Sequence, residues 1–200
     1  MNALEREIGE KLGLEVKIRA RGETGSLTVF YRSLDQPDEH RLVLRADIDD
    51  PRWPLQICST RRNWRFDHSA VRSAQVDTLA AFVQDSRPRP YPPIIGGDFN
   101  AASDSDEIRT LTGAAPVVHD LVLVDAWRHV HAAAPGFTWD NANPYVAAQL
   151  EPTRRIDYVF AGWFKDRGAG NPVSAELFGT GSVDGVHPSD HYGVVAELRY

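Results

Sequence analysis

The sequence predicts a single mixed α/β domain. Its 200 residues suit one folded domain that spans residues 1–200. Segments in which apolar and polar residues alternate, as in strands, are separated by segments with apolar residues three or four positions apart, as in helices. Strands with intervening helices are typical of α/β folds. The composition, 42% hydrophobic and 25% charged, is that of an ordinary globular protein.

The first third of the chain is expected to be a helix followed by strands. Residues 3–12 repeat an apolar residue every four positions and end before a glycine, which is typical of an amphipathic helix. Short strands are expected at residues 15–19 and 26–31. Residues 42–48 alternate apolar and polar side chains, and residues 55–59 form a further apolar segment, so these two segments predict a hairpin.

The middle of the chain predicts a helix, a buried strand and a second helix. Residues 69–84 have the strongest helical spacing, and a proline-rich stretch at 87–93 ends this helix. A strand begins at Ile94. Residues 103–111 are expected to form a short helix that stops at Gly113.

The last part of the chain predicts mostly strands and loops. Residues 121–130 fit both a helix and an extended segment, and both alternatives stay open. A polar, aromatic loop is expected at residues 137–144. Strands are expected at 155–160, 173–178 and 194–198.

Charge and composition limit the classes of function. The net charge of -6 does not favour a dominant sequence-independent grip on nucleic acid, which needs a basic surface. No apolar run has the length of a membrane span, and no secretory signal is visible, so we expect a cytoplasmic protein. The single Cys58 forbids an intrachain disulfide and is expected to be a small core residue.

The stretch Ile94–Asn100 combines a buried strand with polar side chains. On a strand, Asp98 and Asn100 would project from one face and Phe99 from the other. The two glycines before Asp98 let another backbone or a ligand approach closely. A carboxylate and an amide beside a buried strand are costly unless they are satisfied, which favours a functional site. A strand that ends in a polar turn explains the same residues, so the stretch alone leaves both interpretations open.

Three polar clusters in order resemble one known family. They are Gly97-Asp98-Phe99-Asn100, Arg155-Ile156-Asp157-Tyr158 and Ser189-Asp190-His191, and residues 63–75 add to the match. Together they resemble the endonuclease/exonuclease/phosphatase superfamily, which includes DNase I-like nucleases, neutral sphingomyelinases and inositol polyphosphate phosphatases. The resemblance implies a four-layer α/β sandwich of two packed mixed sheets flanked by helices. It also implies hydrolysis of a phosphate ester that depends on Mg²⁺, with Mn²⁺ as the alternative ion.

The resemblance implies a role for each polar residue. His191 would be the general base or its proton-relay equivalent, and Asp157 would accept a hydrogen bond from its ring and fix the tautomer. Asp98 would position the attacking water, and Asn100 would donate to the phosphate. Asp190 would be a Mg²⁺ ligand, because Mg²⁺ prefers one or two carboxylates plus waters.

The same residue types also fit structural roles. Asp157 could pair with Arg154 or Arg155, because ion pairs of this kind are common. Asp125 and Trp139 could line a cleft, but the sequence favours a loop carboxylate and a buried indole as their explanation.

Two departures from the family pattern concern the chemistry. The family opens with a strand that carries an asparagine and a second strand that ends in a Gln-Glu pair, whose glutamate is the main metal ligand. The helix expected at residues 3–12 resembles the one that follows this glutamate, so the domain is expected to be N-terminally incomplete. The family also has a histidine at the position of Arg61. An arginine can bind phosphate, but it is effectively always protonated and cannot shuttle a proton.

These departures leave several functional interpretations. One is an active metal-dependent phosphodiesterase, nuclease or phosphatase with a rearranged metal site. Another is a catalytically silent family member that binds phosphate-containing ligands or a protein, and a third is a truncated form of a larger enzyme. The expected partner is a phosphate-ester substrate, with nucleic acid, a lipid headgroup and inositol phosphates as candidates. An incomplete sheet would leave an uncovered edge, through which we expect self-association.

Overall fold

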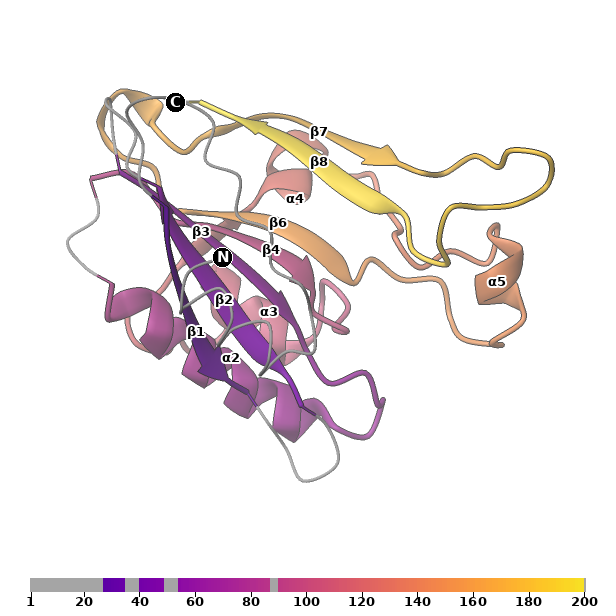
Figure 1. The fold of residues 1–200 in the computed structure, drawn as a ribbon, viewed down its shortest axis with the longest axis horizontal. Coiled ribbons are helices and arrows are strands. Elements are labelled where there is room, and N and C mark those ends of the chain that lie inside the picture. Colours follow the sequence, from indigo (N-terminus) through magenta and orange to yellow (C-terminus); the bar gives the residue numbers. More distant parts are fainter. Residues whose placement is uncertain (1–26, 35–39, 49–53, 87–89, 200) are drawn as a thin grey trace.

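The computed structural model of this protein describes residues 27–34, 40–48, 54–86 and 90–199. The helix expected at residues 3–12 and the strand expected at 15–19 lie outside these ranges. Within them the chain forms an α/β structure with two sheets and flanking helices (Figure 1). No helix in the described ranges is long and apolar enough to cross a membrane.

The larger sheet has six strands in the order β1-β2-β3-β4-β6-β5. In chain order the strands span Leu27–Ser33 (β1), Leu42–Ile48 (β2), Leu55–Arg61 (β3), Ile94–Asp98 (β4), Leu123–Asp125 (β5) and Asp157–Gly162 (β6). Strands β3 and β4 run parallel, and the other neighbouring pairs are antiparallel. The hairpin predicted from residues 42–48 and 55–59 is confirmed as β2 and β3.

Helices α2 (Ser69–Gln84) and α3 (Asp106–Thr112) pack against the larger sheet and enclose the main hydrophobic core. Apolar side chains from both helices and from the sheet meet there, because each element has one apolar face to bury. Large side chains of this core include Leu79, Phe82, Ile95, Phe99, Ile108, Leu111, Leu123, Tyr158 and Phe160. Phe99 therefore belongs to the core, as the alternation in the sequence predicts.

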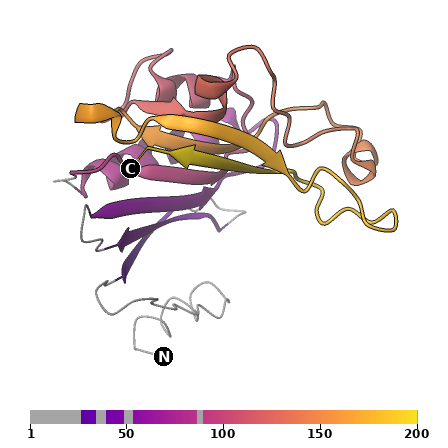
Figure 2. The same ribbon diagram turned by 90° about the horizontal axis from the view of Figure 1, so that it is seen from above.

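The second sheet consists of β7 (Pro172–Phe178) and β8 (Gly193–Leu198), which are antiparallel. Strand β8 lies beside β6, and Figures 1 and 2 show this pair of strands running alongside the larger sheet. The short helix α4 (Ala126–Val130) packs against β7. A further short helix, α5 (Pro144–Ala147), lies in the connection between α4 and β6.

Two boundaries differ from the sequence prediction for local reasons. Helix α3 begins at Asp106 and not near residue 103, because Ser105 has an extended backbone (φ -69°, ψ 154°) and occupies the cap position. The predicted stop at Gly113 is confirmed by its left-handed backbone (φ 79°). The ambiguous segment at residues 121–130 contains both alternatives, since β5 ends at Asp125, whose side chain caps α4.

The register of the larger sheet places three polar residues in one row. Asp98, the last residue of β4, lies opposite Asp157 at the start of β6. On the other side of β4 it lies opposite Arg61 at the end of β3. Directly opposed residues project from the same face of a sheet. These three side chains therefore form the floor of a site where β3 and β4 end and β6 begins.

Gly97 permits this register. Its backbone has φ 143°, and a Cβ atom there would lie 1.9 Å from the carbonyl oxygen of Thr60. A side chain at this position would force β3 and β4 apart. The close approach that the sequence predicts at the glycines is therefore the approach of a neighbouring backbone.

Candidate active site

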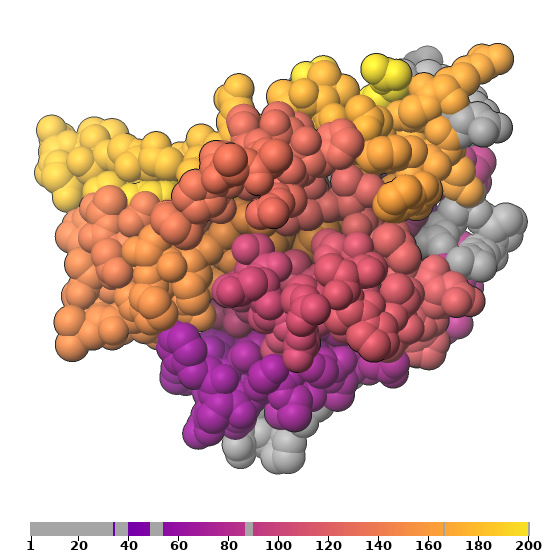
Figure 3. All heavy atoms as spheres, turned by 180° about the vertical axis from the view of Figure 1, so that it is seen from behind, coloured from indigo at the N-terminus to yellow at the C-terminus, as the bar shows by residue number. Residues whose placement is uncertain are grey.

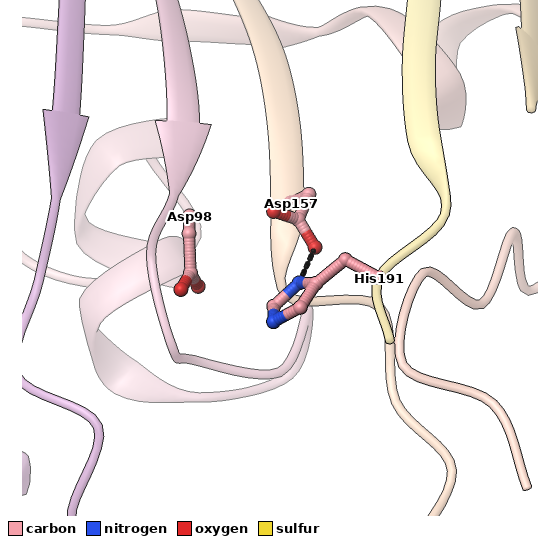
Figure 4. A group of neighbouring side chains, drawn as sticks. All are labelled: Asp98, Asp157 and His191. Atoms are coloured by element: carbon pink, nitrogen blue, oxygen red, sulfur yellow. Dashed lines mark hydrogen bonds and ion pairs between the residues drawn. The ribbon is translucent and has the colours of Figure 1, made fainter. Parts of the chain in front are cut away.

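A side-chain hydrogen bond joins Asp157 to His191 in the site. Asp157 Oδ2 accepts a hydrogen bond from His191 Nδ1 at 2.8 Å. This bond places the proton of the neutral ring on Nδ1 and leaves Nε2 able to accept one. Figure 4 shows the ring between its own strand and Asp98, with the second nitrogen on the side away from the bond to Asp157.

Asn100, two residues after Asp98, fixes the Asp98 carboxylate with two hydrogen bonds. Its backbone N–H donates to Asp98 Oδ1 at 2.8 Å, and its side-chain amide donates to Asp98 Oδ2 at 2.9 Å and to the carbonyl of Arg62 at 3.0 Å. This geometry requires φ 49° at Asn100, a backbone conformation that asparagine tolerates better than most residues. Both amide hydrogens are thus engaged, so donation to a phosphate would require one of these bonds to break.

The structural alternatives for Asp157 are wrong. Arg155 pairs with Asp125 in a buried contact of 2.7 Å, and Arg154 pairs with Glu151. Neither arginine takes the carboxylate of Asp157, which is held by His191 instead.

A pocket of about 220 Å³ adjoins this floor, and Arg61, Asn100 and His191 line it. Arg61 is mostly exposed, and its Nε lies 3.4 Å from Asp98 Oδ2. Trp139 packs edge-on against His191, with ring centroids 4.9 Å apart. Residues that line the pocket are Arg61, Trp64, Asn100, Trp139, Gln149, Glu151, Arg154, Ile156, Asp190 and His191.

Several lining residues have no signal in the sequence. Gln149, Glu151 and Arg154 belong to the connection that leads from α5 back to the start of β6, and they line the pocket there (Figure 1). Trp139, for which a cleft position and a packing role were both open, takes both, since it is buried and lines the pocket.

Burial and neighbouring charges shift the pKa values of the site in one direction. Burial raises the pKa of Asp98, and the charge of Asp157 raises it further, against the opposing effects of the Asn100 N–H, His191 and Arg61. Burial alone would lower the pKa of His191, but the hydrogen bond to Asp157 and the charges of Asp157, Asp98 and Asp190 outweigh it and raise the pKa. The site therefore favours proton uptake.

The site has oxygen and nitrogen donor atoms of the kind that bind a divalent cation. Within the described residues, Asp98, Asp157 and His191 each offer one donor atom, and these atoms lie within 4.8 Å of one another. Two carboxylates are what Mg²⁺ or Mn²⁺ prefers. The predicted ligand Asp190 is exposed at the pocket rim, outside this group, and its Oδ1 accepts a hydrogen bond from Ser189.

Comparison with protein families adds an independent finding. Residues 8–191 match the model of the Endonuclease/Exonuclease/phosphatase family. The chain belongs to this family. The resemblance carried by the three polar clusters is thereby confirmed, and so is the fold class. No curated protein has a sequence that matches this chain.

Solved structures of the family share this fold at low identity. D. rerio TDP2 in complex with a single-strand DNA product is 19% identical, with a TM-score of 0.73 over 88% of this chain and 69% of that one. Truncated Caenorhabditis elegans TDP2 is 18% identical, with a TM-score of 0.70 over 88% and 67%. The mannosyl-6-phosphatase of Bacteroides thetaiotaomicron is 16% identical, with a TM-score of 0.64 over 90% and 69%. At such identities the likeness establishes the fold and leaves the substrate open.

Proposed function

We propose that this member of the family hydrolyses phosphate esters with a water molecule that His191 activates. The observation that supports this most is the 2.8 Å hydrogen bond between Asp157 and His191 at the edge of a polar pocket. His191 Nε2 takes the proton of the attacking water, and the charge of Asp157 stabilises the imidazolium that forms.

Arg61 binds the phosphate in this proposal. Its exposed guanidinium lies at the pocket, where it can contact two phosphate oxygens at once. Asp98 orients the attacking water, and Asn100 holds the Asp98 carboxylate in place. The phosphate contact predicted for Asn100 remains a proposal that requires an amide hydrogen to be released from Asp98 or from the Arg62 carbonyl.

A divalent ion, Mg²⁺ or Mn²⁺, would be held by carboxylates of this site. Asp98 is the first candidate because it belongs to the group of three donor atoms and, unlike Asp157, is not the partner of the proposed base; Asp190 at the rim is the second. When bound, such an ion would neutralise charge on the phosphate oxygens. The Mg²⁺ or Mn²⁺ concentration needed for hydrolysis, compared between Asp190→Asn and Asp98→Asn, distinguishes the two carboxylates.

A nucleic-acid strand is the first substrate candidate. Trp64 is half exposed at the pocket rim, close to the residue that would bind phosphate, and an exposed indole can stack on a base. The D. rerio relative was solved with a single-strand DNA product. The net charge of -6 limits the footprint to a short segment. A sugar phosphate is the second candidate, since one structural relative is a mannosyl-6-phosphatase.

The test compares hydrolysis of bis(p-nitrophenyl) phosphate, p-nitrophenyl phosphate, mannose 6-phosphate and a short single-stranded oligonucleotide with Mg²⁺ and with Mn²⁺. We expect His191→Ala and Asp98→Ala to lower kcat about 10²- to 10⁴-fold. The control is His119→Ala, because His119 forms a similar pair with Asp77 (3.1 Å) on the surface, away from the pocket. Trp64→Ala should weaken hydrolysis of the oligonucleotide alone.

An inactive wild-type protein would sink the proposal of an enzyme. The second interpretation, a silent family member that binds phosphate-containing ligands, then predicts calorimetric binding of inorganic phosphate that Arg61→Ala abolishes. A wild-type protein that neither hydrolyses an ester nor binds phosphate would leave protein binding as the remaining interpretation.

A further inference from the structure

The pair formed by Asp157 and His191 spans two sheets. Asp157 begins β6 of the larger sheet, and His191 precedes β8 of the smaller one. Strands β6 and β8 are not hydrogen-bonded neighbours in the described sheets. Because a hydrogen bond weakens steeply outside its narrow range of distance and angle, something else has to fix the two sheets relative to each other.

Thr138 contacts the chain on both sides of this gap. Its side chain is buried, and Oγ1 accepts hydrogen bonds from the backbone N–H groups of Ile156 and Asp157, each at 3.1 Å. Its carbonyl accepts a bond from the N–H of Tyr192 at 2.8 Å. One residue therefore bonds to Asp157 itself and to the residue that follows His191.

Asn143 fixes the segment that precedes His191. Its side chain is fully buried, and Nδ2 donates to the carbonyls of Ser189 at 2.8 Å and Asp190 at 3.3 Å. Its Oδ1 accepts the N–H of Tyr145 at 3.0 Å and so caps α5. Asn143 belongs to the connection between α4 and β6, and Ser189 and Asp190 belong to the connection between β7 and β8. Figure 3 shows these two connections, in orange and yellow, packed together as a projection at one end of the molecule.

The residues between Thr138 and Asn143 complete the link. Trp139 exchanges backbone hydrogen bonds with Arg154, so this loop is also tied to the segment that enters β6. Its ring packs edge-on against the ring of His191. The loop at residues 138–143 thus contacts Asp157 through Thr138 and the His191 ring through Trp139.

We infer that Asn143 and Thr138 are positioning residues that hold Asp157 and His191 at bonding distance across the two sheets. The inference rests on the proposed function for its kinetic consequences. Neither residue lines the pocket; each acts through the backbone that carries Asp157 or His191. A purely structural role would lower stability and leave the geometry of the pair unchanged.

The first experiment uses Asn143→Asp. Aspartate keeps the oxygen that caps α5 and removes both N–H donors, and its charge faces two carbonyl oxygens. We expect kcat to fall about 10- to 100-fold with little change in KM, as for other residues that orient a reacting side chain. The matched control is Asn141→Asp, in the same loop. The Asn141 side chain is exposed, and among the described residues it bonds only to the carbonyl of Glu151.

A spectroscopic measurement tests the geometry without turnover. The His191 N–H that bonds to Asp157 should give a downfield proton resonance, identified by its loss in His191→Gln. Asn143→Asp should shift or broaden this resonance, and Asn141→Asp should not. If wild-type protein hydrolyses no ester, the proposed function fails and the resonance alone still decides the inference.

Thr138 supplies a second pair of variants in case Asn143→Asp does not fold. Thr138→Ser keeps the hydroxyl and should behave like wild type, whereas Thr138→Val keeps the shape and should lose kcat and the resonance. Equal behaviour of the two would overturn the role of the hydroxyl. Folded Asn143→Asp and Thr138→Val proteins with a lower Tm but unchanged kcat and resonance would show a structural role and overturn the inference.

Discussion

Two arginines precede Asp157 in the sequence, yet neither pairs with it. Arg155 contacts Asp125, and Arg154 contacts Glu151, so each arginine has its own carboxylate. This arrangement matters for the chemistry, because an arginine against Asp157 would compete with His191 for the same oxygens. At the scale of the residue, the site depends on which charged side chains form pairs.

If the proposed hydrolysis uses His191 as the base, this pairing predicts how the rate depends on pH. His191 must be neutral to accept a proton, and Asp157 and Asp98 raise its pKa against the effect of burial. We therefore expect kcat/KM to rise with pH through a pKa above the ordinary histidine value of about 6.5. Asp157→Asn should move this limb to lower pH, since a stabilising negative charge is lost, and should lower the plateau about 10²- to 10⁴-fold because the tautomer is no longer fixed.

The measurement is kcat/KM across the range from mildly acidic to mildly basic pH for both proteins, at constant ionic strength. Glu151→Gln is the control, because it removes a carboxylate of the same pocket that is paired with Arg154. A wild-type limb below the ordinary histidine value, or an Asp157→Asn limb at higher pH than wild type, would contradict this assignment.

At the scale of elements, the two glycines of β4 have different tasks. The backbone of Gly97 is in a conformation that side chains rarely adopt, and it lies against Thr60 of β3. Gly96 has ordinary space, since a Cβ atom there would lie 3.7 Å from its nearest neighbour, the carbonyl oxygen of Tyr158. Of the two glycines, Gly97 is therefore the one that β3 and β4 need in order to pair. This pairing in turn places Arg61 opposite Asp98.

Alanine at these two positions gives a direct comparison. Gly97→Ala should lower the free energy of unfolding by about 3 kcal/mol or more, because it adds backbone strain to a clash with a neighbouring strand. Gly96→Ala should change it by about 1 kcal/mol or less. Urea denaturation of both variants measures the difference, and equal stability of the two would show that the contact between the strands is not limiting.

At the scale of the whole molecule, the two sheets are unequal. The described part of the larger sheet has six strands, whereas the smaller has two, and a two-stranded sheet is marginal without further packing. Val173, Phe178 and Val195 of β7 and β8 are exposed. Exposed apolar side chains on a small sheet favour association with another chain.

We accordingly expect the protein to self-associate through β7 and β8. Val195→Lys should weaken this association at least about tenfold, because a charge replaces an exposed apolar side chain in the contact. Val117→Lys is the matched control. Val117 is also exposed, but it follows α3, which packs against the larger sheet. Sedimentation velocity across a range of concentrations measures both, and a wild-type protein that stays monomeric throughout would refute the expectation.

The sequence by itself determined the elements and the family. Helix α2 and strands β2, β4 and β7 follow from apolar spacing, because burying one face of an element requires a local repeat. The residues of the proposed acid–base pair, Asp157 and His191, were identified through motifs that resemble the family, and the structure brings them together.

Tertiary structure alone decided the contacts between segments distant in the chain. The choice of partner for Arg154 and Arg155, the engagement of both Asn100 amide hydrogens, and the pocket wall from the α5 connection depend on how loops pack at the sheet edge. Such contacts leave no repeat in the sequence. They are selected by distance and desolvation in the folded protein, where a buried polar group must find a partner. For the same reason the link from Thr138 and Asn143 to Asp157 and His191 becomes visible only once the two sheets are in place.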